Sequence, residues 1–551
     1  MNRGIIIAFL FLFSLTGLVK AQSDDWEDDS KIDDKEIVIE KDKKIELPIA
    51  NKNYEKIPQL PPSHKYTVKP YKLSNYSMVY SPVNPGIRVL KIKDEKLNKL
   101  YGNYIKAGYG NFGTPLLEAF VSNKRNEDYL VGARFNHFSS SKGPVDDENS
   151  ASGMTEAGIF AKAFTDKATI GGKLEFSNRF NYFYGYNPAL EVSRDSIKQK
   201  FNTFGISLGV EGNDEKSPVQ YALDASFYSI GDNYDASETS FGLKFNGDYK
   251  LSESSSIGLE SSLDLSTYKD PDSQKRNIFR IYPSYTFNYE NLLIKAGLNV
   301  AFENDTLSGK DDLHIYPMAE VTWPVEGDFK VSAGIRGDID RVNYRDLTEV
   351  NPWLNQQVPL LHTNRKIDFY GRIKGKISNS FDFSAGVSLA QLENFHVFIN
   401  DPSDSARFLP LYDLGTTSRT TLDGEVSYEY RDLFFLNAKI EVFNYDTDEI
   451  GDAWHLPNLS FNLSGGYNIY DKILLEAELI TLTGLNALDP VDQTSVKLDG
   501  IADMNFKAEY LISERASVFL NFYNVFSSEY ERYLNYPSRG FMFVGGISYS
   551  F

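Results

Sequence analysis

Most of this chain alternates between hydrophobic and polar positions, in runs of about ten to fifteen residues. In residues 366–377, for example, Phe369 and Ile373 fall on one face, and Arg372 and Lys374 fall on the other. Successive side chains of a strand point to opposite sides, so each run predicts a strand with one apolar face. Strands of soluble sheets usually have about five or six residues, whereas strands that cross a membrane need about nine or more. The pattern therefore favours a transmembrane β-barrel.

Short connections between these runs broadly alternate with longer ones. Residues 289–291 and 431–432 are short connections, whereas residues 344–365 and 399–417 are long ones, and 408–412 within the second is a further strand candidate. A barrel with tight periplasmic turns and longer outer loops produces this alternation. The runs predict an all-β fold, a large antiparallel transmembrane β-barrel of about 22 strands, with 20 or 24 as alternatives.

The first hundred residues lack this pattern. Residues 1–21 have a basic start, an apolar run and a small-x-Ala end, which predict a secretory signal peptide. Residues 22–100 are acidic and proline-rich, which predicts a largely irregular, extended N-terminal arm in the periplasm. Residues 101–551 are then the barrel. The island Glu36, Ile37, Val38, Ile39 and Glu40 is a candidate for binding a periplasmic partner protein by strand addition, and a charged linker is the alternative.

The C-terminus carries a second targeting signal. The last run alternates large apolar residues with small or polar ones and ends in Tyr549, Ser550 and Phe551. It resembles the closing strand of an outer-membrane barrel. Tyr549 and Phe551 are therefore candidates for the assembly signal that the barrel-assembly machinery reads. This predicts the outer membrane of a Gram-negative cell as the location and its lipid as the surroundings.

Composition excludes several functions. The chain of 551 residues has no cysteine, so disulfides, thiolate metal sites and cysteine nucleophiles are excluded. Its formal net charge is −19, which disfavours nucleic acid as a partner. Its six histidines show no metal-ligand spacing, and no G-x-S-x-G motif stands beside a plausible histidine and acid. The sequence thus predicts no enzyme activity, no metal and no cofactor.

Charged residues gather on the polar faces of residues 328–341 and 366–377. If these two runs pair, their charges face the lumen. The candidate lumen-lining residues are Lys330, Arg336, Asp338, Asp368, Arg372, Lys374 and Lys376. Two interpretations remain open: a surface that tunes the selectivity of a conduit, or facing charges that pair and stiffen the wall.

The C-terminal stretch from Val496 resembles the end of TonB-dependent receptors. The resemblance rests on an Asn-Val-Phe strand end at residues 524–526, a Tyr-Pro-x-x-Gly loop at 536–540 and the terminal Ser-Tyr-Ser-Phe. The barrel of that family has 22 strands. Its members also carry an N-terminal plug of well over a hundred residues, and residues 22–100 leave no room for a full one.

The resemblance implies transport. The sequence predicts a transport conduit or receptor of TonB-dependent-receptor type for an unidentified solute or polymer. The alternative is a non-catalytic scaffold subunit of an outer-membrane complex that recruits periplasmic partners through the arm.

Overall fold

A computed structural model describes residues 101–124, 126–187, 189–214, 216–304, 313–325 and 327–551. In it, 22 strands form one antiparallel sheet in which each strand pairs with its neighbours along the chain. The first strand also pairs with the last, so the sheet closes into a barrel with a radius of 19 Å. The predicted fold class and the predicted strand number are both confirmed.

Short strands and one short helix occupy the connections between the barrel strands. The barrel strands are β1 (Asn103–Gly110), β2 (Thr114–Ser122), β3 (Tyr129–Ser140), β4 (Ser152–Phe164), β5 (Ala168–Tyr182), β6 (Lys198–Gly212), β7 (Val219–Asp232), β8 (Ser237–Ser252), β9 (Ser255–Lys269), β10 (Ser273–Tyr289), β11 (Leu292–Glu303), β12 (Leu313–Pro324), β13 (Lys330–Asp340), β14 (Thr363–Ser378), β15 (Phe381–Asp401), β16 (Asp404–Tyr430), β17 (Phe434–Asp446), β18 (Leu459–Ile469), β19 (Ile473–Thr483), β22 (Ile501–Leu511), β23 (Ala516–Tyr523) and β26 (Met542–Ser550). The connections hold α2 (Tyr344–Val350), β20 (Asn486–Leu488), β21 (Ser495–Lys497), β24 (Glu531–Tyr533), β25 (Tyr536–Pro537) and the 3-10 turns η1 (Asp147–Ser150) and η2 (Arg194–Ile197).

The alternation of the sequence sets the two faces of the wall. On β14, Phe369, Ile373 and Ile377 are 51%, 46% and 66% exposed, although they are large and apolar. Such exposure is expected of side chains that meet hydrocarbon. Polar residues that alternate with them, such as Asp368 and Arg372, form ion pairs on the inner face.

Glycines allow the barrel to close. At the seam between β1 and β26, Gly108 and Gly546 are register partners. A Cβ on Gly546 would lie 2.1 Å from the carbonyl oxygen of Ala107, closer than atoms can approach. The two closing strands therefore fit together only because this position has no side chain.

The structure corrects the prediction in three connections. Residues 399–417, predicted as a long connection, instead prolong β15 and β16 into one long hairpin that turns at residues 402–403. The strand candidate 408–412 within it is confirmed as part of β16. The predicted loop 344–365 contains the helix α2. Alternation predicts one strand over residues 496–511, but the structure divides it, because Ser495–Lys497 pairs with β20 and only Ile501–Leu511 joins the barrel.

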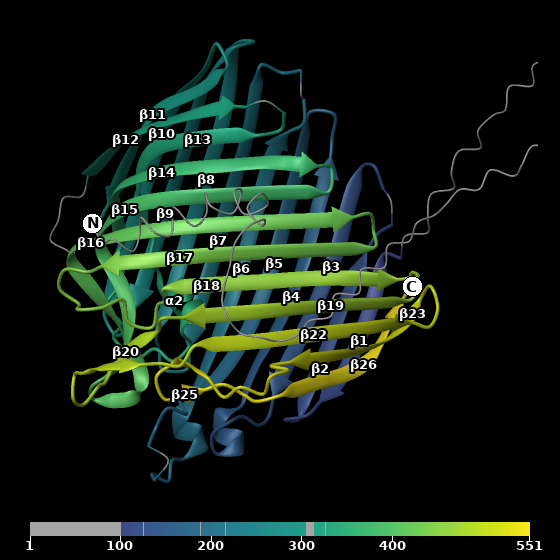
Figure 1. Cartoon of the computed structure of the whole chain (residues 1–551), viewed down its shortest axis with the longest axis vertical. Helices are drawn as coiled ribbons and strands as arrows, with labels where there is room; N and C mark the ends of the chain where they lie inside the picture. The colour runs from purple at the N-terminus through teal and green to yellow at the C-terminus, as the bar shows by residue number, and fades with distance from the viewer. Residues whose placement is uncertain (1–100, 125, 188, 215, 305–312, 326) are drawn as a thin grey trace, which may run out of the picture. The chain divides into compact units, whose positions relative to one another are not determined.

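The long connections pack together into a cap, which we define as the described residues of 183–197, 341–362, 394–413, 447–458 and 524–541. Figure 1 shows α2, β20 and β25 gathered at one end of the barrel and the C-terminus at the other. One buried cluster joins Phe201 and Tyr268 of the β6–β9 wall to Phe408 and Tyr536, which come from distant parts of the ring. Because this core unites residues from far-apart strands, the cap extends across the mouth of the barrel.

Candidate functional site

The structure places all seven candidate lumen residues on β13 and β14, which pair as the sequence predicted. Five of them form ion pairs. Arg336 pairs with Asp368 at 2.9 Å, as the facing runs suggested. Asp338, Arg372 and Lys376 instead find partners outside the predicted pair of runs, and Lys330 and Lys374 form no ion pair within the described ranges. Their role in transport stays a prediction.

Arginines link four strands and the cap on this wall. Arg280 on β10 contacts Asp264 at 3.3 Å and Asp338 at 3.0 Å, so it reaches from β9 to β13. Arg341, just beyond β13, contacts the other oxygen of Asp264 at 2.8 Å. Arg365 on β14 pairs with Asp340 on β13. Because each carboxylate meets at least one guanidinium, the network braces the wall.

Asp368 is the most enclosed carboxylate of this network. Its side chain is 1% exposed, and it accepts hydrogen bonds from Arg336 Nε and, at 2.6 Å, from Ser388 Oγ. Arg365 Nη1 lies 3.7 Å away. These donors offset the cost of burying the carboxylate.

Sequence reasoning missed Asp264, Arg280, Arg341 and Arg365. Arg280 and Asp338 are separated by 58 residues and by two intervening strands. Alternation places both on the inner face, but it gives no information on how far a side chain reaches around the curved wall. The sequence feature that could have indicated Arg280 is its place on the polar face of an alternating run.

The same wall holds the loop that contains α2. Arg276 on β10 donates hydrogen bonds to the carbonyl oxygen of Val342 and, at 3.0 Å, to His362 Nδ1. The backbone N–H of Val342 also donates to His362 Nδ1, at 3.2 Å. Asn343 caps α2 by accepting a hydrogen bond from the backbone N–H of Asp346. Both ends of the 341–362 segment are therefore tied to the arginine network.

Gly386 on β15 makes room for an ion pair that spans three strands. Its register partners are Arg372 on β14 and Asp423 on β16, whose side chains meet over it at 2.9 Å. A Cβ on Gly386 would lie 2.7 Å from Asp423 Oδ1 and 2.9 Å from Arg372 Nη2. The bridge exists because the strand between its partners has no side chain there.

Gly386→Ala is expected to separate Arg372 from Asp423 and to lower the free energy of unfolding by about 1 kcal/mol. Denaturant unfolding in detergent measures the change. Gly371→Ala is the matched control, because a Cβ there meets only ordinary contacts at 3.7 Å or more. Equal stability of the two variants would contradict the role given to Gly386.

Two buried histidines hold the cap through their neutral form. His455 donates from Nδ1 to the carbonyl oxygen of Phe398 at 2.8 Å, and its Nε2 accepts from the backbone N–H of Leu534 at 3.2 Å. Burial, with Arg532 nearby, lowers the pKa of His455 to about 4, and the hydrogen bond to Phe398 opposes this shift. Burial, followed by Arg276, also holds the pKa of His362 well below its usual range. Protonation of either ring would place a proton on the nitrogen that now accepts a hydrogen bond, so that two donors would face each other.

The cap is therefore expected to lose stability in acid. The folded cap binds fewer protons than the unfolded chain between the ordinary histidine pKa of 6.5 and the His455 pKa of about 4. Above pH 6.5 the neutral histidine contributes its full stabilisation to the folded cap. As the pH falls through this window the contribution is lost, and at pH 4 His455 alone lowers the free energy of unfolding by about 3 kcal/mol. Limited proteolysis of the long connections at pH 7.5, 5.5 and 4.5 measures this loss. His455→Gln should flatten the pH dependence.

The remaining predicted residues lie apart from this wall. Tyr549 on β26 and Phe551 just after it are 48% and 42% exposed on the outer face, with ring centroids 6.2 Å apart. Their part in assembly stays a prediction. Residues 36–40 lie outside the described residues, as do the predicted signal peptide and arm.

Two further findings concern metals and helices. In the part of the chain that the structure describes, no group of three or more histidine, aspartate or glutamate side chains is placed to hold a metal ion. Its helices, searched over the same residues, include none with the length and apolar character needed to cross a membrane.

A closed ring of 22 antiparallel strands with an apolar outer face and a charged inner face defines an outer-membrane β-barrel. Neither protein-family models nor curated proteins give a match by sequence. Solved structures do match the fold. The FrpB iron transporter of Neisseria meningitidis (F3-3 variant) has a TM-score of 0.63 at 12% identity, over 83% of this chain and 82% of that one.

Two other receptors share the fold. The ferric-catecholate import receptor Fiu of E. coli K12 has a TM-score of 0.62 at 11% identity, over 82% of each chain. The siderophore receptor PiuA of Acinetobacter baumannii has a TM-score of 0.59 at 10% identity, over 83% of this chain and 82% of that one. The barrel is thus like those of TonB-dependent receptors, which are transporters rather than enzymes. The resemblance seen at the C-terminus extends to the whole ring.

Proposed function

We propose that this chain is a transport conduit or receptor of TonB-dependent-receptor type for an unidentified solute or polymer. The observation that carries the proposal is the contrast between the charged inner wall of the barrel and the packed cap at its mouth. The wall has a charged inner face, and its mouth carries a packed cap tied to that wall by Arg276 and Arg341. A polar lumen beneath a cap suits a pathway that opens on demand.

The residues that make up the cap support the same proposal. Its core consists mainly of aromatic and aliphatic side chains from separate connections. Polar contacts that tie it to the wall include Arg179 with the carbonyl of Thr348, Tyr344 with Asp232, and Trp353 with the carbonyl of Tyr182. Separate connections can move apart without breaking the strand ladder below. Iron and siderophore cargo belongs to the matched structures, and the solute of this chain is a separate question.

Planar-bilayer conductance tests the proposal, with the full chain and with a variant lacking residues 22–100. A conduit gives discrete conductance in at least one form. Lys374→Glu in the conducting form should then move the reversal potential in a salt gradient toward cation preference, because the variant replaces an inner-face cation by an anion. Absence of conductance from both forms would overturn the proposal and favour the scaffold alternative.

A further inference from the structure

Two neighbouring cross-strand rows of the inner wall differ in one informative respect. In the row nearer the cap, Arg372 and Asp423 close their ion pair over Gly386. The next row toward the short turns has the same order, with Lys374 on β14, Ser384 on β15 and Glu425 on β16. Yet among the described residues no ion pair within 4.0 Å forms to Lys374 or Glu425. Opposite charges flank a small residue here without meeting.

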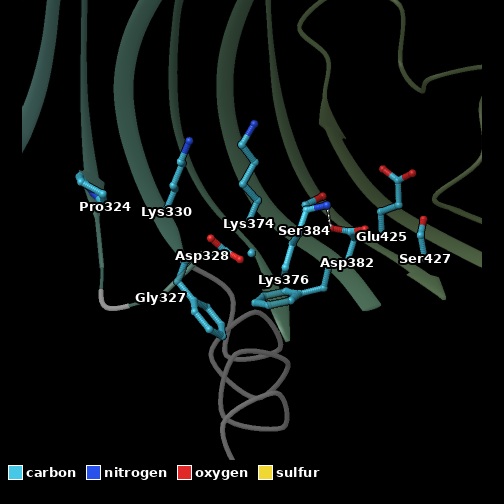
Figure 2. Close-up of a pocket in the computed structure, with 13 residues that line it drawn as sticks. Pro324, Gly327, Asp328, Lys330, Lys374, Lys376, Asp382, Ser384, Glu425 and Ser427 are labelled. Carbon is cyan, nitrogen blue, oxygen red and sulfur yellow. Dashed lines mark ion pairs between the residues drawn. The ribbon is translucent and has the colours of Figure 1, made fainter. Parts of the chain in front are cut away.

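Lys330 adds a second cation beside Lys374. The two lysines are register partners on β13 and β14, and like charges placed opposite each other repel. They line a cavity of about 580 Å³, within the range of roughly 300–1,000 Å³ typical of small-ligand pockets. Figure 2 shows Lys330, Lys374 and Glu425 extending to the same side of the wall. The repulsion between the lysines falls if an anion lies between them.

Two other lysines near the cavity are already paired. Lys376 is held by Asp382 at 3.3 Å, marked by the dashed line in Figure 2. Lys439, the register partner of Glu425 on β17, is held by Glu441 at 3.0 Å. Asp328 lines the cavity from the turn before β13. Three lysines and three carboxylates line the cavity, so its formal charge is balanced. A simple anion would meet Glu425, and a simple cation would meet the lysine pair.

We propose that this cavity binds a short zwitterionic peptide, with its carboxylate on Lys330 and Lys374 and its ammonium group on Glu425. β14 and β16 are two strand spacings apart, about 10 Å, and an extended tripeptide spans about the same length. The inference rests on the proposed function, because the conduit brings the solute to the inner wall. It deepens that function by naming the class of solute.

Isothermal titration calorimetry on the full chain in nanodiscs tests the proposal with triglycine, N-acetyl-triglycine and triglycine amide. The acetyl group removes the ammonium charge, and the amide removes the carboxylate. Each modification should weaken binding at least about fivefold relative to triglycine. Glu425→Gln should weaken triglycine binding by a similar factor and should not weaken N-acetyl-triglycine binding further, because the same contact is already absent.

Lys330→Gln with Lys374→Gln should weaken triglycine and N-acetyl-triglycine alike and leave triglycine amide unchanged. Lys173→Gln is the matched control, since Lys173 is an inner-face lysine of β5 that pairs with Glu175 at 2.8 Å. Equal affinity for triglycine and N-acetyl-triglycine would show an anion site and overturn the proposal. Conductance without triglycine binding would refute the peptide site alone, whereas binding without conductance would refute the conduit alone.

Discussion

Phe408→Ala is expected to loosen the cap while leaving the ring of strands intact. Phe408 is fully buried, and its ring lies 5.3 Å from that of Tyr533, 5.6 Å from that of Tyr536 and 5.6 Å from that of His455. Phenylalanine-to-alanine changes in a packed core cost about 3–5 kcal/mol. The loss falls on the cap, because the contacts of this ring are to the long connections rather than to the β1–β26 seam.

Limited proteolysis of the long connections should detect the loosened cap, together with a higher open probability in planar bilayers. Phe369→Ala is the control of the same chemistry, since Phe369 lies 51% exposed on the outer face of β14. Its removal should leave both readouts near those of the unchanged protein. Unchanged proteolysis of Phe408→Ala would show that the cap does not depend on this core.

Asp368→Ala is expected to destabilise the wall itself. The variant leaves Ser388 without its acceptor and takes a carboxylate from both Arg336 and Arg365. Breaking an enclosed charged pair from one side costs about 3–5 kcal/mol. The expected loss is near the lower figure, about 3 kcal/mol, because Arg336 is 45% exposed and Arg365 keeps Asp340.

Denaturant unfolding in detergent, followed by loss of β-sheet circular dichroism, measures this change. Asp382→Ala provides the comparison, because the Lys376–Asp382 pair is about half exposed on each side and such pairs contribute less than about 1 kcal/mol. A loss for Asp368→Ala no larger than that for Asp382→Ala would show that the arginine network does not brace the wall.

Alternation predicted the ring well because each barrel strand separates lipid from lumen, and that boundary repeats every second residue. The first two runs alternate poorly, yet the strands they predict at residues 103–111 and 114–122 match β1 (Asn103–Gly110) and β2 (Thr114–Ser122). Alternation failed at residues 399–417 for a physical reason. There the β15–β16 hairpin continues into the cap, where both faces of β15 are covered by protein, since the adjacent residues Val397 and Phe398 are both buried.

The candidate site was predictable in part. Pairing of the two charged runs brought Arg336 to Asp368, because register partners lie opposite each other. The longer ion pairs cross intervening strands. Arg372 reaches Asp423 only over Gly386, and Arg280 reaches Asp338 across two strands. Such contacts require the curvature of the wall, which a single run of sequence does not contain.

The seam between β1 and β26 has a consequence for assembly. Seven register pairs, from Tyr104 with Ser550 to Gly110 with Val544, join the first and last strands of the described ring. The ring therefore presents no unpaired backbone edge onto which another chain could add a strand. Any oligomer built around this wall has to form through side chains, with the apolar outer faces of two barrels meeting or sharing lipid.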